Sequence, residues 1–344
     1  MRLIHSLLFA LLTLLVCCCS APSEGVSDTE EVTTETAADT AQWQTVATTG
    51  EPTARHENAF TELDGKFYLI GGRGNKPVDI YDPATQSWST GAQPPLEMHH
   101  FQAVPHQGKI YVMGAFTGGY PDETPIPHVY SYDPASDQWE RGAEIPEARR
   151  RGAAGVVVHD NHFYIVCGIR NGHLGDYKDW LDEYDLATNT WTALPNAPHT
   201  RDHFQAVVAD GKIYAAGGRN SSAATEQTFE LTVPEVDVYD VASQEWQTLS
   251  ASLPTERAGS TTVLVDNNIV VIGGESDAME AAHHQVEALN IATGTWEEWP
   301  RLEQGRHGTQ AAMYDGTIHI AAGSGNRGGG PELTSLEKYQ PLSQ

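Results

Sequence analysis

Six tryptophans recur along this chain at nearly constant intervals, and this period limits the possible folds more than any other feature. They are separated by 45, 51, 52, 55 and 50 residues and are, in order, Trp43, Trp88, Trp139, Trp191, Trp246 and Trp296. Self-similarity at a fixed period of about 50 residues is typical of chains that repeat one supersecondary unit. The sequence therefore predicts a repeat architecture.

Each repeat contains two predicted β-hairpins. The outer hairpin turns at a Tyr-Asp pair that a tryptophan follows, as in Tyr81-Asp82 and Trp88, because Asp-Pro or Asp-x followed by Thr or Ser is turn chemistry. The inner hairpin turns at Asp64-Gly65 in the first repeat, and Asp-Gly between apolar runs is a strong hairpin signal. The inner hairpin ends in Gly71-Gly72, a pair that indicates close approach of backbone. Four strands per repeat predict the blade of a β-propeller.

The last repeat lacks one strand, and the N-terminal segment can supply it. Six inner hairpins are present, but the chain passes Tyr339-Gln340 without a further tryptophan, whereas Trp43 precedes the first hairpin. A strand near Gln42–Ala47 can complete the last blade and remove two open sheet edges. We therefore predict an all-β, six-bladed propeller whose ring is closed by the N-terminal strand.

These motifs resemble the kelch repeat, and the resemblance covers about residues 41–344. The glycine pair or a close substitute occurs six times, and the Tyr-x6-Trp spacing occurs four times. The resemblance implies a kelch β-propeller similar to exported kelch proteins of bacteria.

Residues 1–19 read as an export signal. Arg2 precedes the apolar run Leu7–Val16, which is shorter than the roughly 18–20 residues that span a bilayer. Cys17, Cys18 and Cys19 end this run, and their placement resembles the lipobox of bacterial lipoproteins, with Cys18 as the lipidated residue in the best register. The alternative is an ordinary cleaved signal peptide. Either reading predicts an exported protein, and the lipobox places it at the bacterial cell envelope, in the periplasm or on the cell surface.

Residues 20–40 are predicted to be a disordered acidic tether. They hold six carboxylates and no lysine or arginine, and they show no periodic apolar pattern. Such a segment cannot bury enough apolar surface to offset the entropy of ordering. The propeller then spans residues 41–344.

Composition limits the partners. The net charge is −26, from 46 acidic and 20 basic residues, which argues against nucleic acid or an anionic membrane as a partner because the field repels phosphates. Membrane association is expected only through the lipid anchor. After the signal, Cys167 is the one remaining cysteine, so no intramolecular disulfide is expected. We expect a monomer.

Arginines and histidines gather at one predicted end of the propeller. In an antiparallel blade, the start of the inner strand and the end of the second strand lie at the same end. Eleven of the 14 arginines fall in these segments. The candidate ligand-binding residues of this mouth are Arg55, Arg73, His100, Arg151, Arg201, His203, Arg219, Arg257, Arg306 and His307. Guanidinium groups suit carboxylate, phosphate or sugar hydroxyls, and imidazoles add donors that titrate near neutrality. The alternative is that arginines recurring in every blade belong to the scaffold.

Five segments that do not repeat also lie at the mouth, where loops on a rigid scaffold carry binding residues. They are Phe116–His128, Asn171–Trp180, Asn220–Pro234, Glu275–Gln285 and Gly325–Leu333. No cofactor and no metal site is expected, because the adjacent pairs His99-His100 and His283-His284 point opposite ways on a strand. Copper radical oxidases share kelch repeats but need a cysteine cross-linked to tyrosine. Cys167 occupies a repeat glycine position, which excludes that chemistry.

Three functions stay open. The leading hypothesis is a non-enzymatic binding module that recognises a glycan or an acidic peptide at the Arg/His-rich mouth. A second is a sugar-active enzyme similar to the sialic-acid mutarotase among kelch propellers, with Arg201, His203 and Glu57 in acid–base and substrate-binding roles. A third is a purely structural envelope protein whose ring arginines are all internally paired.

Overall fold

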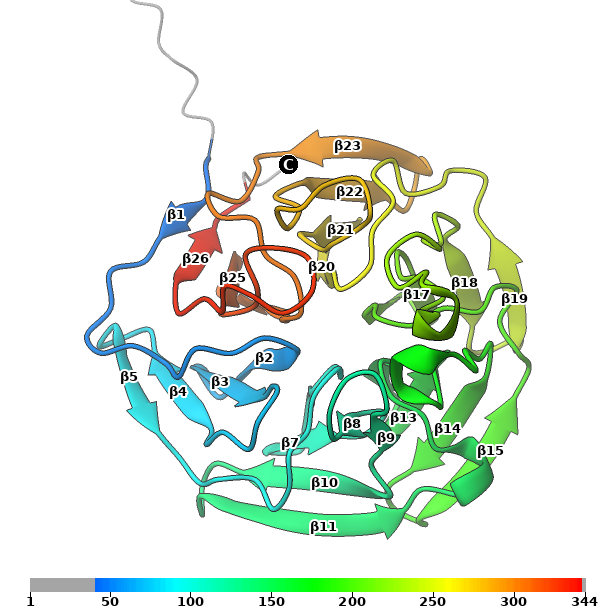
Figure 1. The fold of residues 1–344 in the computed structure, drawn as a ribbon, viewed down its shortest axis with the longest axis horizontal. Helices are drawn as coiled ribbons and strands as arrows, with labels where there is room; N and C mark the ends of the chain where they lie inside the picture. Colours follow the sequence, from blue (N-terminus) through cyan, green and yellow to red (C-terminus); the bar gives the residue numbers. More distant parts are fainter. Residues whose placement is uncertain (1–40, 342–344) are drawn as a thin grey trace, which may run out of the picture. The chain divides into compact units, whose positions relative to one another are not determined.

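Six four-stranded antiparallel sheets surround a central axis in the computed structural model, which describes residues 41–341 (Figure 1). The first strands of neighbouring blades contact one another around this axis. The predicted all-β, six-bladed propeller is therefore confirmed. The predicted signal and tether lie outside the described residues.

The blades follow one another along the chain. From the axis outward, blade 1 consists of β2 (Asn58–Leu63), β3 (Lys66–Gly71), β4 (Asp79–Asp82) and β5 (Ser87–Thr90). Blade 2 consists of β6 (Val104–His106), β7 (Lys109–Val112), β10 (His128–Asp133) and β11 (Gln138–Glu144). Blade 3 consists of β12 (Gly155–His159), β13 (His162–Val166), β14 (Leu181–Asp185) and β15 (Thr190–Leu194). Blade 4 consists of β16 (Ala206–Ala209), β17 (Lys212–Ala215), β18 (Asp237–Asp240) and β19 (Glu245–Thr248). Blade 5 consists of β20 (Thr261–Val265), β21 (Asn268–Ile272), β22 (Val286–Asn290) and β23 (Thr295–Trp299). Blade 6 consists of β24 (Ala311–Tyr314), β25 (Thr317–Ala321), β26 (Leu336–Tyr339) and β1 (Gln44–Thr45).

Turn chemistry and aromatic packing explain each blade. Asp64 and Gly65 both have positive φ, at 51° and 79°, as the two central residues of a tight hairpin turn require. In the outer hairpin, Tyr81 on β4 lies opposite Trp88 on β5, with ring centroids 5.2 Å apart. The tyrosine is buried and the tryptophan half-buried, so the pair fills space between neighbouring sheets.

The N-terminal strand closes the ring as predicted, although it is only two residues long. Gln44 pairs with Lys338 and Thr45 with Glu337 on β26 (Figure 1). Trp43 is buried, stacks on Tyr339 at 5.5 Å, and donates a hydrogen bond from Nε1 to the carbonyl of Pro300 at 2.8 Å. Blade 6 therefore joins both ends of the described chain and leaves no unpaired gap in the ring.

The glycine pair that ends the inner hairpin sits against the next blade. Gly71 has φ +69°, and a Cβ there would lie 2.3 Å from the carbonyl oxygen of Met98, which precedes β6. No side chain fits at that distance, so this position is glycine for lack of space. Cys167 stands at the same position in blade 3, with φ +54°, and is buried.

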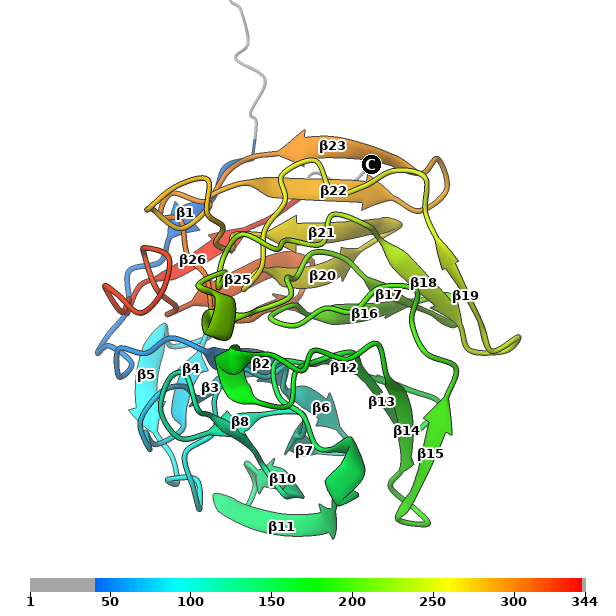
Figure 2. The same cartoon turned by 45° about the vertical axis from the view of Figure 1, so that its right-hand side comes forward.

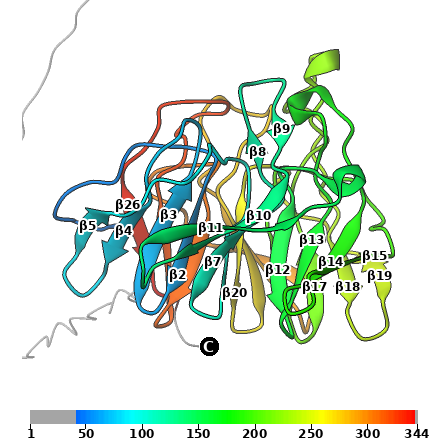
Figure 3. The same cartoon turned by 90° about the horizontal axis from the view of Figure 1, so that it is seen from below.

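The two ends of the propeller differ. Figure 2 shows the blades obliquely, and the side view in Figure 3 shows the turns between first and second strands at one end and longer loops with the β8–β9 hairpin (Phe116–Thr117, Thr124–Pro125) at the other. The loop-bearing end also holds the short 3-10 helices η2 (Gly172–Leu174) and η3 (Ala223–Thr225); η1 (Glu147–Arg149) precedes β12. Among the described residues, none belongs to a helix long and apolar enough to cross a membrane.

Candidate functional site

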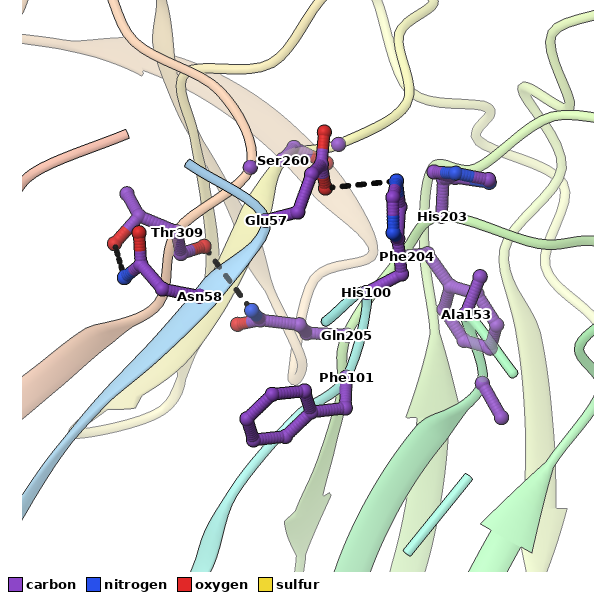
Figure 4. A pocket seen from close by; sticks show the side chains of 13 residues that line it. Glu57, Asn58, His100, Phe101, Ala153, His203, Phe204, Gln205, Ser260 and Thr309 are labelled. Atoms are coloured by element: carbon purple, nitrogen blue, oxygen red, sulfur yellow. Dashed lines mark hydrogen bonds and ion pairs between the residues drawn. The ribbon is translucent and has the colours of Figure 1, made fainter. Parts of the chain in front are cut away.

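A ring of backbone hydrogen bonds joins all six blades just before their inner strands. One residue per blade takes part and has a left-handed backbone: Glu57, His100, Ala153, His203, Gly259 and Gly308, with φ between 51° and 63°. Each amide from His100 onward donates to the carbonyl of the preceding member, and the amide of Asn58 closes the ring on Gly308. These bonds fix the neck of the axial channel, and Figure 4 shows Glu57, His100 and His203 projecting into it.

A cavity of about 450 Å³ lies above this neck, at the loop-bearing end. Its floor includes Glu57 and His100, and its walls come from the segments that follow the second strands. Tyr120 and Phe229, from two of the non-repeating segments, form an aromatic part of the lining together with Thr228. Tyr120 is 56% exposed. The volume falls in the range typical of small-molecule sites, about 300–1,000 Å³, and a lining of polar and aromatic side chains is also typical of such sites.

Two arginines of the cavity wall are already paired with buried carboxylates. Arg73 Nη2 lies 2.7 Å from Glu123 Oε1, and Arg219 Nη1 lies 2.5 Å from Glu275 Oε1. Burial alone raises the pKa of Glu123, but contacts with His173 and Arg73 outweigh it and lower the pKa to about 2. For Glu275, His307 and Arg219 likewise outweigh burial and lower the pKa to about 2. Both carboxylates are therefore ionised at neutral pH.

Three imidazoles converge beside the neck from three different blades. His100 precedes β6, His203 precedes β16, and His173 lies in η2, in the loop that follows β13. Their ring centroids are 4.6–5.1 Å apart, and all three side chains are buried. Burial, followed by neighbouring imidazoles, holds the pKa of His100 well below its usual range. Burial, followed by Arg219, does the same to the pKa of His203. Both rings are neutral near pH 7.

Known proteins share this architecture. The family model described as the Attractin/LZTR1 β-propeller matches residues 25–282. The chain belongs to this family of kelch-repeat β-propellers.

Among the relatives of this kelch propeller, Kelch-like protein terF of Aspergillus terreus is 27% identical over 321 residues, covering 87% of the chain and 68% of the fungal protein. Human Kelch-like protein 23 is 26% identical over 292 residues, and the match covers 83% of the chain but 48% of the human protein. N-acetylneuraminate epimerase 1 of Escherichia coli is 24% identical over 286 residues, covering 68% of the chain and 74% of the enzyme. A solved structure titled "Structure of YjhT" has TM-score 0.70 at 14% identity, covering 84% of the chain and 96% of that structure, which shows a shared fold.

The five ring arginines do not face the cavity of the kelch propeller, which corrects their assignment as ligand-binding residues. Arg55, Arg151, Arg201, Arg257 and Arg306 are each buried inside their own blade. They form ion pairs with Asp79, Asp182, Asp237, Glu287 and Glu337, respectively. Each also donates to the carbonyl of the residue sixteen positions later, at the end of the second strand. Most of their donors are used within the scaffold; among these five described residues, only the Nε atoms of Arg201 and Arg306 lack a hydrogen-bond partner, and both side chains are buried.

Four other predicted residues come together at the site. Arg73, His100 and Arg219 line the cavity, and His203 lines the neck below it. His307 is buried beside them, with Nδ1 3.6 Å from Glu57 Oε1 and Nε2 3.4 Å from Glu275 Oε2. Whether any of the five binds a ligand stays a prediction.

Sequence reasoning did not single out His173, Glu123, Glu275, Tyr120 or Phe229. Each lies in one of the non-repeating segments, which were predicted to carry binding residues as segments. The repeat pattern could not rank residues within them, because these segments have no counterpart in the other blades.

Proposed function

We propose that this kelch propeller is a binding module that takes a glycan in the cavity at its loop-bearing end. Binding is the general function that a kelch propeller supports. The observation that carries the proposal is the composition of the cavity wall. The lining combines carboxylates that accept hydrogen bonds, guanidinium groups that donate them and aromatic rings, namely Glu57, Glu275, Arg73, Arg219, Tyr120 and Phe229. Sugar hydroxyls both donate and accept, so they match such a wall.

The charges favour a sugar over an acidic peptide. Both cavity arginines are engaged with Glu123 and Glu275, and the ion-pair partners of Glu57 among the described residues are imidazoles. These acids would repel a ligand rich in carboxylates at close range. A hydroxyl-rich ligand carries no negative charge and would not be repelled. The exposed face of Tyr120 and the ring of Phe229 can pack against the apolar face of a sugar ring.

A glycan array screened with residues 41–344 tests this proposal, followed by calorimetric titration of any ligand it identifies. Tyr120→Ala and Phe229→Ala should each weaken binding, while Tyr314→Ala should not. Tyr314 is a matched control because it is also exposed but ends β24, at the opposite end of the propeller. An array without signal, or ligand affinity that neither rim variant changes, contradicts the proposal.

An enzyme acting on sugars is the second candidate, favoured by the similarity to N-acetylneuraminate epimerase 1. The cavity floor offers an acid–base pair, Glu57 Oε2 and His100 Nε2, 3.4 Å apart (Figure 4). Arg201 cannot take the substrate-binding role considered above, because it is buried against Asp237. A sugar-anomerisation assay with wild type and Glu57→Gln separates this candidate from binding alone. Turnover by the wild type that the variant loses supports the enzyme.

We also propose that the protein is exported and held at the bacterial cell envelope by a lipid on Cys18. The triple cysteine at the end of an apolar run supports this. In a bacterial host, the full chain should incorporate labelled palmitate, and a variant with serine at Cys17, Cys18 and Cys19 should not. Equal release of both forms into the medium contradicts the anchor.

A further inference from the structure

Hydrogen positions around the channel neck follow from the partners of each imidazole. His99 Nε2 lies 2.9 Å from the carbonyl oxygen of Gly118, which can only accept, so His99 carries its hydrogen on Nε2. Its Nδ1 is then an acceptor, 2.6 Å from His100 Nδ1, which must donate. A neutral His100 is therefore left with a bare Nε2.

The same reasoning applies to His203. Its Nδ1 contacts the carboxylate of Asp202 and carries the hydrogen of the neutral ring, so Nε2 is bare. His173 Nδ1 lies 2.9 Å from Glu123 Oε1 but has no hydrogen-bond partner among the described residues. His203 Nε2 has no hydrogen-bond partner among the described residues, although its side chain is almost completely buried. An unpartnered buried acceptor of this kind needs an explanation.

Two imidazole nitrogens also lie near Glu57. The bare Nε2 of His100 is 3.4 Å from Glu57 Oε2. His307 donates from Nε2 to the carbonyl of Asn326, and its Nδ1, which has no hydrogen-bond partner among the described residues, is 3.6 Å from Glu57 Oε1. Imidazole nitrogens therefore gather around one carboxylate in the neck. A cation bound beside them would be held by nitrogen and oxygen lone pairs together.

We propose that His100, His173 and His203 bind a divalent transition-metal ion of the Zn²⁺ class at the floor of the cavity. One ring nitrogen from each residue lies within 4.8 Å of the others, close enough for small side-chain rotations to bring them to one ion. Imidazole ligands suit Zn²⁺ and its neighbours, whereas Ca²⁺ and Mg²⁺ require oxygen ligands. This inference goes beyond glycan binding and does not depend on it.

The surroundings match those of a metal site. Asp202 contacts the outer nitrogen of His203 and Glu123 Oε1 lies 2.9 Å from Nδ1 of His173; carboxylates that bond the outer nitrogen orient histidine ligands and raise their basicity. Three histidines leave one coordination position open, as in catalytic zinc sites, and Glu57, His100 and His173 all line the cavity. The nearby group of Glu57, Glu275 and His307 is a weaker candidate, because Arg219 already neutralises Glu275.

Metal titration of the full chain tests the proposal, with Cys17, Cys18 and Cys19 changed to serine so that these thiols cannot bind metal. After treatment with chelator, the protein should take up one equivalent of Co²⁺, with the visible absorption of a nitrogen-ligated ion, and Zn²⁺ should displace it. Zn²⁺ should also raise Tm, because it binds the folded state. Absence of stoichiometric uptake overturns the proposal.

Single variants at the three histidines locate the ion. His100→Gln, His173→Gln and His203→Gln should each abolish the Co²⁺ absorption and the Zn²⁺-induced rise in Tm. Asp202→Asn should weaken affinity by about 10–100-fold. His319→Gln is the matched control, since it is buried on β25 away from the cavity, and it should retain both signals. The histidines lie in separate blades, so any one folded variant decides: unchanged uptake in it overturns the proposal.

Discussion

At the scale of single residues, the ring arginines and their acids behave as a unit of the repeat. Each acid stands two residues before the aromatic position of its third strand, as Asp79 does before Tyr81. The second repeat has Met98 in place of the arginine, and there Tyr130 stands at the position of the acid. The arginine and its acid are therefore replaced together in this repeat, which is a sequence signal that the ring arginines belong to the scaffold.

Arg201→Ala should lower the free energy of unfolding by about 3–5 kcal/mol, because it leaves Asp237 buried without its cation. Arg301→Ala is the control: its pair with Glu298 is exposed and worth about 0–1 kcal/mol. Urea unfolding measures both. The double change Arg201→Met and Asp237→Tyr, which copies blade 2, should recover most of the loss. A small loss for Arg201→Ala would refute the scaffold role.

In contrast to Arg201, the side chain of Glu57 should contribute to ligand binding in the cavity and little to the free energy of unfolding. Glu57 is buried, forms no ion pair with a lysine or arginine in residues 41–341, and has φ 56° at a ring position that Gly259 and Gly308 occupy in other blades. A left-handed backbone costs a non-glycine residue about 1 kcal/mol or more. Glu57→Gly should therefore unfold at equal or higher urea concentration while cavity binding weakens.

Ala153→Gly controls for backbone strain, since Ala153 has φ 51° at the same ring position but carries no polar group. It should gain stability and leave binding unchanged. A loss of about 2 kcal/mol or more in Glu57→Gly would mean that the carboxylate holds the imidazoles in place, and would contradict this interpretation.

At the scale of elements, the hairpins were predictable because their determinants are local. Asp64-Gly65 imposes its turn and Tyr81 meets Trp88 across one strand pair. The cavity was not predictable to the same extent. His173 reaches the site from η2, in a segment without periodicity, and only the fold brings it to His100 and His203. Long-range convergence of this kind leaves no pattern along a single chain.

Strand β1 has only two residues, but its loss should lower Tm strongly. Deleting residues 20–40 should leave Tm nearly unchanged, whereas extending the deletion through Ala47 should lower it strongly. The longer deletion exposes the edge of β26 and removes Trp43. Trp43→Ala alone should cost about 3–5 kcal/mol. Equal melting of the two deletion variants would show that β1 does not hold the ring closed.

At the scale of the whole molecule, charge is divided between the two ends of the propeller. Five of the six inner hairpins turn at an aspartate, namely Asp64, Asp160, Asp210, Asp266 and Asp315, at the end opposite the cavity. Six of the 14 arginines are buried in pairs with carboxylates at the other end. The net charge of −26 therefore comes from carboxylates that have no such arginine partner and repel one another.

Salt should stabilise this protein. Raising NaCl from about 10 mM to 300 mM shortens the Debye length from about 30 Å to below 8 Å, which screens repulsion between exposed carboxylates but hardly reaches buried pairs. Exposed pairs such as Lys109–Glu140 lose little, since each contributes about 0–1 kcal/mol. Tm should therefore rise with NaCl, and choline chloride at equal ionic strength should raise it as much if screening is the cause. A fall in Tm would mean that exposed ion pairs, not the buried ring arginines, hold the blades together.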